Sequence, residues 1–378
     1  MRPMMNSTRV LWALLLLTVP ACTQMEQVRV SPDNAGFVLA ASGRPFVPWG
    51  MNYIGPLGQK SWGPHWATIE KDFAEMKRMG VNVVRVHLEY GIFMDSPDKP
   101  NERSLKELGR LLALAERMEM YLDITGLGCY LKANTPAWYD AMSDADRWAS
   151  QSRFWEAVAA VGASSPAIFC YDLMNEPISP GGKRNPGEWY GPELAEHRFI
   201  QWIALDQAGR PREEISLDWV RQLCAAIHRQ DKEHMITVGL LPPVKGEYFF
   251  GFDPHNLVDD LDFISVHIYP GTGKVDESLA DLKKFAVGRP VVVEETFPMA
   301  CGKDDLREFI LASRGIASGW IGHYNVLSRA ELETLQRDKK ITVAQFQLLS
   351  WYELFEELGP NITHGVTTAP ASSSSAPK

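Results

Sequence analysis

The segment Ala167-Ile168-Phe169-Cys170-Tyr171-Asp172-Leu173-Met174-Asn175-Glu176-Pro177 is the most informative part of this chain. It begins as a mostly apolar run of strand length, which is typical of a strand buried on both faces. Its closing proline ends the hydrogen-bond ladder, so Asn175 and Glu176 are expected where the strand leaves the sheet. In a barrel of parallel strands, that rim carries the chemistry. The same triplet is also common at ordinary turns and helix caps, so the rest of the chain has to distinguish the two interpretations.

Composition limits the classes of partner. The chain has 378 residues and a formal net charge of −9, without any basic block. It can bury a large core, as one barrel or as two ordinary domains, and a nucleic-acid partner is not expected. The cysteines other than Cys22 form no CxxC pair, and no HExxH motif is present. The sequence therefore predicts neither a metal nor another cofactor.

The N-terminus has the features of an export leader. Arg2 and Arg9 precede the apolar run 10–19, which is too short for a stable membrane span. Residues 19–21 lead into Cys22 and resemble a bacterial lipoprotein box, in which the cysteine is lipidated. We expect residues 1–22 to be a leader and the protein to be exported. It would be a lipoprotein of the bacterial cell envelope (periplasmic or surface) or a secreted protein, with Cys22 as its only membrane attachment.

Short apolar segments alternate with amphipathic ones through most of the chain. Strands are predicted at 46–52, 81–88, 120–125, 167–175, 235–241, 261–269, 290–295 and 319–324. Helices are predicted at 68–79, 105–118, 143–161, 215–228, 277–285, 306–314 and 341–358. This alternation is typical of an α/β protein with a (β/α)8 TIM barrel. A doubly wound open sheet would normally have a glycine-rich turn after its first strand, and residues 50–52 do not form one.

The predicted domain organisation follows from the same pattern. A small β-hairpin at 28–46 is expected to cover the bottom of the barrel. The catalytic domain would span 23–366, with a long insertion at about 178–213 that is typical of a functional loop. Residues 367–378 are rich in alanine, serine and proline, and we expect them to be disordered.

Polar side chains stand at the ends of several predicted strands: Asn52, Arg85, His87, Asn175, Glu176, His267, Tyr269, Glu294 and Glu295. Buried charges cost free energy unless they are paired, so a functional site explains this cluster better than a structural core does. Strand side chains alternate between the two faces, so we expect only one of Glu294 and Glu295 to face the barrel axis.

These residues make the chain resemble glycoside hydrolase family 5, the cellulase- and mannanase-like family in a clan of retaining TIM-barrel glycosidases. The resemblance covers 46–358 and rests on residues 50–52, Arg85, 175–177, 267–269 and 290–295. It implies a hydrolase of O-glycosyl bonds that acts on a β-linked glycan by double displacement. Glu176 would be the acid/base. Glu295, five residues past Pro290, would be the nucleophile.

The resemblance also implies roles for the neighbouring side chains. Arg85 would keep the nucleophile ionised and oriented. Asn175 would hydrogen-bond the sugar 2-hydroxyl in the transition state. His267 and Tyr269 would position and shield the nucleophile. Asn52 would support the rim of the barrel rather than contact the substrate.

Two departures from the family pattern bear on the substrate. Many members have a histidine at the end of the third strand, where this chain has residues 125–128 without one. Most also have a tryptophan platform at the end of the eighth strand. Trp320 is too early for that position, so either Tyr324 is the platform or the site has another shape. The linkage and the sugar, whether glucan, mannan or a rarer glycan, stay open at this point.

The insertion contains aromatic residues just after the acid/base strand. We predict that Trp189 forms one wall of the sugar-binding groove, beside Tyr190. Trp202 either joins that wall or packs the insertion onto the barrel. The partner is expected to be an oligo- or polysaccharide, and the protein a monomer. Two alternatives use the same scaffold: a transglycosylase with the same two glutamates, and a surface glycan-binding barrel that has lost its chemistry.

Anchoring through Cys22 can be tested directly. Replacing the cysteine with alanine removes the thiol that would carry the lipid, so C22A should lose its partitioning into the membrane fraction. The measurement is the distribution of the two forms between membrane and soluble fractions. Identical partitioning of both forms would leave ordinary secretion as the interpretation.

Overall fold

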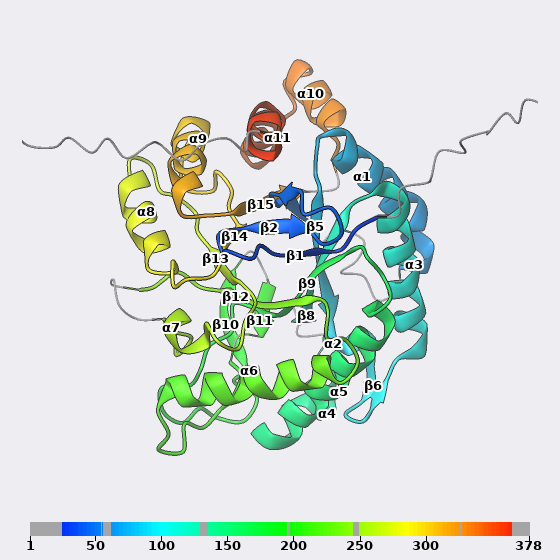
Figure 1. Ribbon diagram of the computed structural model, residues 1–378, viewed down its shortest axis with the longest axis vertical. Helices are drawn as coiled ribbons and strands as arrows, with labels where there is room; N and C mark the ends of the chain where they lie inside the picture. The colour runs from blue at the N-terminus through cyan, green and yellow to red at the C-terminus, as the bar shows by residue number, and fades with distance from the viewer. Residues whose placement is uncertain are drawn as a thin grey trace, which may run out of the picture.

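A computed structural model of the chain describes residues 25–53, 55, 62–128, 135–194, 197–200, 202–244, 249–324 and 327–364. The predicted leader at 1–22 and the predicted tail at 367–378 lie outside these residues. Eight parallel strands form a closed barrel, and helices surround it (Figure 1). The predicted (β/α)8 barrel is therefore confirmed.

The strands of the barrel follow one another in chain order, and the last pairs with the first. They are β4 (Trp49–Tyr53), β5 (Val83–Glu89), β8 (Tyr121–Gly128), β9 (Ile168–Asn175), β12 (Met235–Leu240), β13 (Ile264–His267), β14 (Val291–Glu295) and β15 (Gly319–Tyr324). The described helices are α1 (Trp66–Arg78), α2 (Tyr90–Phe93), α3 (Glu102–Met118), α4 (Ala137–Asp140), α5 (Asp144–Gly162), α6 (Arg212–His228), α7 (Pro254–Leu257), α8 (Val275–Lys283), α9 (Lys303–Ala312), α10 (Arg329–Arg337) and α11 (Val343–Thr363).

A small antiparallel sheet closes the bottom of the barrel. It has three strands rather than the two of the predicted hairpin: β1 (Val28–Val30), β2 (Phe37–Leu39) and β3 (Pro45–Phe46). Phe37 packs edge-on against Phe169 and Phe263, which stand at the start of the barrel strands, with ring centroids 5.2 Å apart in both pairs. This apolar plug seals the end of the barrel opposite the carboxyl ends of its strands.

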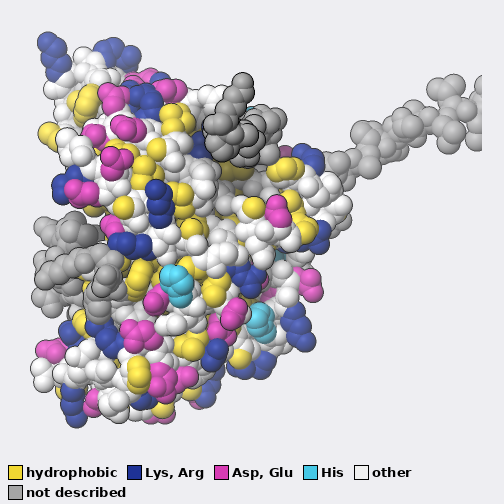
Figure 2. Space-filling model, turned by 60° about the vertical axis from the view of Figure 1, so that its left-hand side comes forward, with side chains coloured by type: hydrophobic (Ala, Val, Ile, Leu, Met, Phe, Trp, Pro, Cys, Tyr) yellow, Lys and Arg dark blue, Asp and Glu magenta, His cyan; other side chains and the backbone are white. Residues whose placement is uncertain are grey.

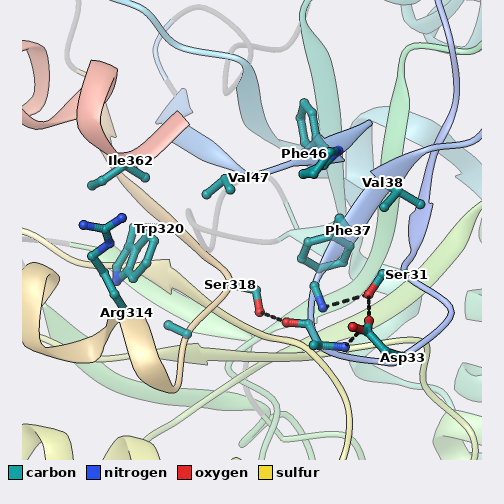
Figure 3. Close-up of a pocket in the computed structure, with 14 residues that line it drawn as sticks. Ser31, Asp33, Phe37, Val38, Phe46, Val47, Arg314, Ser318, Trp320 and Ile362 are labelled. Carbon is teal, nitrogen blue, oxygen red and sulfur yellow. Dashed lines mark hydrogen bonds between the residues drawn. The ribbon is translucent and has the colours of Figure 1, made fainter. Parts of the chain in front are cut away.

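A cavity of about 420 Å³ lies beside this sheet. Figure 3 shows it between Phe37 and Phe46 on one side and Trp320 and Ile362 on the other. Ser318 Oγ donates to the carbonyl of Ala35 across its floor at 3.0 Å. The cavity is therefore at the bottom of the barrel, far from the rim where the predicted site residues stand.

Two further hairpins extend from the barrel. One is formed by β6 (Met94–Ser96) and β7 (Lys99–Pro100), and the other by β10 (Tyr190–Leu194) and β11 (His197–Ile200). The second lies within the predicted insertion at 178–213.

On the face shown in Figure 2, acidic and basic side chains are interspersed rather than gathered by sign. Among the described helices, none is both long and apolar enough to cross a bilayer.

Side-chain caps explain several helix boundaries. Ser143 caps α5 by accepting from the N–H of Asp146 at 3.1 Å, as its sequence position predicts. Helix α10 was not predicted, because Leu332 is its only buried residue and apolar periodicity is therefore weak. Its sequence signal was the capping box that Ser328 and Glu331 form.

The ladders of the barrel contain irregularities that set the direction of the site residues. Between β13 and β14, Val266 pairs with Val293, and the next residue, His267, pairs with Glu295. Strand β14 therefore has one extra residue there, as in a β-bulge, and Glu294 and Glu295 both face inward. The expectation that only one of them faces the axis is wrong because it assumed an unbroken pleat.

One glycine decides how closely the last helix packs on the barrel. A methyl group at Gly322 in β15 would overlap the indole of Trp351 in α11. The G322A substitution should therefore lower the free energy of unfolding by about 1–3 kcal/mol, as overpacked cores do. Urea unfolding measures this change. The control is G36A, whose added methyl would meet only Ser318 at 4.0 Å and should be near neutral. Equal stability of both variants would contradict the packing described here.

Candidate active site

Arg85 lies at the centre of the cluster of polar residues, with its guanidinium fully buried in the barrel. Its Nη1 donates to Glu295 Oε1 at 2.6 Å and to Asn52 Oδ1 at 2.8 Å. Its Nη2 donates to Asp172 Oδ2 at 2.7 Å and to Asn175 Oδ1 at 3.1 Å. One cation from β5 thus connects side chains of β4, β9 and β14.

Glu295 is held by several donors. Besides Arg85, the Tyr269 hydroxyl donates to Glu295 Oε2 at 2.5 Å. Burial opposes ionisation, but the nearby charges of His267 and Arg85 hold the pKa of Glu295 far below its usual range. The side chain of Glu295 is 12% exposed, so it is in contact with solvent in the mouth of the barrel. Glu295 is therefore a fixed carboxylate anion that a substrate can approach.

Glu176 has an unusual backbone conformation for a residue other than glycine. Its φ is +52°, in the left-handed region, where side chains are disfavoured. Its N–H donates to the carbonyl of Gly239 at 2.8 Å, and its side chain is 22% exposed. The carboxylates of Glu176 and Glu295 offer oxygens within 4.8 Å of each other. Two acids with different partners therefore face one another at the mouth of the barrel.

His267 contacts Glu176 as well as Glu295, the candidate nucleophile that it was predicted to position. Its Nδ1 lies 2.9 Å from Glu176 Oε1 and 3.6 Å from Glu295 Oε2, so the acid/base candidate is its nearer partner. Burial disfavours a charge on the ring, but the three surrounding glutamates raise the pKa of the imidazole to about 10. His267 is therefore an imidazolium at neutral pH, and both of its nitrogens donate.

A second layer of acids lies beneath the rim, and two of its three members, Asp123 and Asp172, were not predicted. Asp123, Asp172 and Glu294 are fully buried, and each offers an oxygen within 4.8 Å of the other two. Burial and the charge of Glu294 raise the pKa of Asp172 to about 6. Such a set of oxygens is also of the kind that binds a divalent cation, but here the guanidinium of Arg85 supplies positive charge. The sequence signal was a single acid within each of two buried strands.

Gly239 in β12 leaves the space in which these groups converge. A Cβ at this position would lie 2.8 Å from Glu294 Oε2, 2.9 Å from His267 Nε2 and 3.0 Å from Arg85 Nη2. Its N–H donates to Asp172 Oδ1 at 2.8 Å, and its carbonyl accepts from Glu176. This residue therefore anchors the backbone of the site while leaving room for its side chains.

Two predicted substrate contacts are wrong. Tyr324 points away from the axis, because it occupies the outward-facing position of β15. Its ring stacks on Tyr352 at 5.6 Å, and its hydroxyl contacts Asp72 at 3.4 Å. The inward-facing neighbour, His323, takes the place near the site. It hydrogen-bonds the Tyr269 hydroxyl at 2.9 Å and stacks on that ring.

The prediction that Trp189 forms a wall of the sugar-binding groove is also wrong. The Trp189 side chain is fully buried, and it packs against Tyr139 and under the guanidinium of Arg147 from α5. Its ring therefore holds the insertion against the barrel instead of forming a wall of the cleft. Trp202 is half-buried, and the guanidinium of Arg184 lies 3.9 Å from its ring centroid, so it too has a partner within the insertion. Tyr190 hydrogen-bonds Thr135.

Comparisons with known proteins agree on one family. Residues 39–303 match the model for cellulase, glycosyl hydrolase family 5. A mannan endo-1,4-β-mannosidase A of Podospora anserina is 26% identical over 192 residues, which are 46% of this chain and 43% of that protein. A mannan endo-1,4-β-mannosidase 2 of Oryza sativa subsp. japonica is 24% identical over 281 residues, 67% of this chain and 61% of that protein. The chain thus spans less than two thirds of these curated relatives.

Solved structures share the fold at low identity. An exo-β-1,4-mannosidase from Opitutaceae bacterium strain TAV5 superposes with a TM-score of 0.61 at 16% identity, covering 88% of this chain and 62% of that chain. A β-mannanase from the blue mussel Mytilus edulis gives a TM-score of 0.59 at 16% identity, covering 89% of this chain and 97% of that chain.

The imidazolium of His267 predicts how stability depends on pH. Because its pKa in the folded protein is raised, its contribution to stability is complete below its ordinary value of 6.5 and is lost as the pH rises through about 10. The free energy of unfolding should therefore fall more steeply over this range in the unmodified protein than in H267Q. One proton gives a difference of at most about 1.4 kcal/mol per pH unit.

Urea unfolding at several pH values measures these slopes. The control is H255Q, which replaces a histidine whose side chain is 68% exposed and should keep the slope of the unmodified protein. If H267Q and the unmodified protein have parallel curves, the charged imidazole is not present.

Proposed function

The chain belongs to glycosyl hydrolase family 5, and on this premise we propose that it hydrolyses β-1,4-mannosidic bonds by double displacement. Glu176 would be the acid/base and Glu295 the nucleophile. One observation carries this proposal: the two carboxylates face each other at the barrel mouth with oxygens within 4.8 Å.

The separation of the acids supports retention of configuration. Retaining glycosidases have carboxyl groups about 5 Å apart, whereas inverting enzymes need a wider gap for a water molecule between acid and base. The short distance between Glu176 and Glu295 leaves no such gap. A covalent glycosyl-enzyme intermediate is the route that fits this spacing.

The first step forms the intermediate. Glu176 gives its proton to the glycosidic oxygen as Glu295 attacks the anomeric carbon, so that the bond to the leaving sugar breaks with its electron pair on that oxygen. Arg85 and Tyr269 hold the nucleophile in place through their hydrogen bonds to its two oxygens. The partly exposed Asn175 stands beside Arg85, where its amide could hydrogen-bond the sugar 2-hydroxyl.

The second step releases the sugar. Glu176, now a carboxylate, removes a proton from a water molecule, which attacks the anomeric carbon and frees Glu295. The strained backbone of Glu176 and its hydrogen bond to Gly239 keep its side chain directed into the mouth for both steps. The same residue thus acts first as acid and then as base.

The relatives and neighbours support the choice of substrate. Both curated relatives are named mannan endo-1,4-β-mannosidases, and the two solved neighbours are an exo-β-1,4-mannosidase and a β-mannanase. These names include endo- and exo-acting enzymes, so the proposal concerns the β-1,4-mannosidic linkage. We also propose export, with Cys22 as a lipid anchor, on the evidence of the leader sequence, which lies outside the described residues.

Substitution of the two glutamates tests the mechanism. E295A should lose hydrolysis of β-mannan almost completely, and added azide should restore turnover of an activated aryl glycoside with inverted product. E176A should lose about 10²–10⁴-fold on β-mannan, whose leaving group needs protonation. It should nevertheless still form the intermediate from the activated substrate, whose leaving group needs none. The control is E277A, because the side chain of Glu277 in α8 is 70% exposed.

The stereochemistry gives the decisive measurement. Proton NMR of the anomer that is released first, recorded before mutarotation, should show the configuration of the substrate. An inverted first product from the unmodified protein would exclude Glu295 as a covalent nucleophile. Turnover of β-glucan without turnover of β-mannan would leave the mechanism standing and replace the substrate.

A further inference from the structure

Glu294 is one of the buried acids that the mechanism above does not use. Its Oε1 accepts from Ser265 Oγ at 2.9 Å, and its Oε2 lies 3.4 Å from His267 Nε2. The other ring nitrogen of His267 lies 2.9 Å from Glu176 Oε1. One imidazole therefore connects a fully buried carboxylate with the partly exposed acid/base residue.

We propose that Glu294 is a positioning residue that acts through His267 on Glu176, which makes it part of the acid/base machinery rather than of the nucleophile. This inference rests on the proposed function. It also assigns a role to the bulge in β14, which turns Glu294 and Glu295 into the same barrel interior. Glu295 would attack the anomeric carbon. Glu294 would act on the leaving oxygen indirectly, through His267 and Glu176.

Arg85 is one of two positively charged partners of Glu294, the other being His267. Its guanidinium already donates to Asp172 at 2.7 Å and to Glu295 at 2.6 Å, whereas its distance to Glu294 is 3.5 Å. A buried carboxylate is costly unless hydrogen-bond donors satisfy it. For Glu294, these donors are Ser265 and the imidazolium of His267. Arg85 and His267 therefore both offset the charge of Glu294, and the histidine is the partner that also contacts Glu176 and so links Glu294 to it.

Gly239 provides the space for this contact. A Cβ there would lie within 3.0 Å of Glu294 Oε2, His267 Nε2 and Arg85 Nη2. The carbonyl of the same residue accepts the N–H of Glu176 at 2.8 Å. The backbone of the acid/base residue and the Glu294–His267 contact are therefore anchored at a single position in β12.

The arrangement has a chemical consequence for Glu176. A carboxylate on one ring nitrogen fixes the orientation of an imidazole and favours its charged form. With both nitrogens protonated, Nδ1–H donates to Glu176 Oε1. The transferable proton of Glu176 then belongs on Oε2, so the histidine selects which oxygen presents it to the leaving group.

Several charged or titratable groups surround this imidazole, and Glu294 is one contributor to its charge. Glu176, Glu294 and Glu295 favour the imidazolium, whereas a like charge such as that of Arg85 opposes it. Five other titratable side chains surround this group of residues. They are His87 in β5, Asp123 in β8, Asp172 in β9, Tyr269 just after β13 and His323 in β15.

Leaving-group dependence tests the role of Glu294. The E294Q variant keeps the shape of the side chain and removes its charge. Its kcat/KM should fall about 10–100-fold on β-mannan but less than about 3-fold on 2,4-dinitrophenyl β-mannobioside, whose departure needs no proton. In the contrasting variant Y269F, Glu295 loses a hydrogen-bond donor, so kcat/KM should fall by a similar factor on both substrates. An equal loss on both substrates in E294Q would overturn the proposal.

The titration of His267 gives a readout that does not depend on turnover. In histidine-ring NMR spectra, the imidazole of E294Q should lose its proton at least about one pH unit lower than in the unmodified protein. An unchanged titration would overturn the proposal. If E294Q does not fold, S265A removes the Ser265 donor to Glu294 and should show the same selective loss to a smaller extent; Thr237, which also donates to Ser265, keeps its hydrogen bond to the carbonyl of Phe263. Failure of the unmodified protein on every β-mannan would refute the proposed function alone, because the titration still reports the contact.

Discussion

The buried guanidinium of Arg85 is the interaction on which the site depends. A charge without exposure is tolerated only when its hydrogen bonds and counter-charges replace the lost water. Here, acids from β9 and β14 and amides from β4 and β9 supply them. These strands are far apart in sequence, so the barrel has to close before the cation is satisfied. Folding and assembly of the candidate active site are thus the same event.

Irregular backbone at the rim directs the side chains around this cation. The extra residue in β14 turns two consecutive glutamates inward, and a register shift between β9 and β12 occurs just before Asn175. Glu176 then adopts a left-handed conformation. A regular pleat would have sent one of Glu294 and Glu295 into the helix layer. The departures from ideal geometry occur where the proposed chemistry needs two acids with different environments.

The two acids differ through their partners. Glu295 has Arg85 and Tyr269, which hold it as an anion, whereas Glu176 has the imidazolium of His267 and a larger exposed fraction. Glu294 links these environments from below through the same histidine. The insertion contributes differently: its buried Trp189 packs with Arg147, and this contact fixes the segment that follows β9. The ring of Trp189 is therefore not available for contact with a substrate.

From the amino-acid order alone, the eight-strand barrel and its rim could be predicted, because burial periodicity and the ends of strands are local properties. Arg85, Asn175, Glu176, His267, Tyr269 and Glu295 were recognised in this way, and the structure brings them together. The inward direction of Glu294, the outward direction of Tyr324 and the burial of Trp189 could not be predicted. The direction of a strand side chain depends on bulges, and bulges arise from register with neighbouring strands. Burial of an aromatic ring depends on what another segment places over it, and both are consequences of closing the barrel.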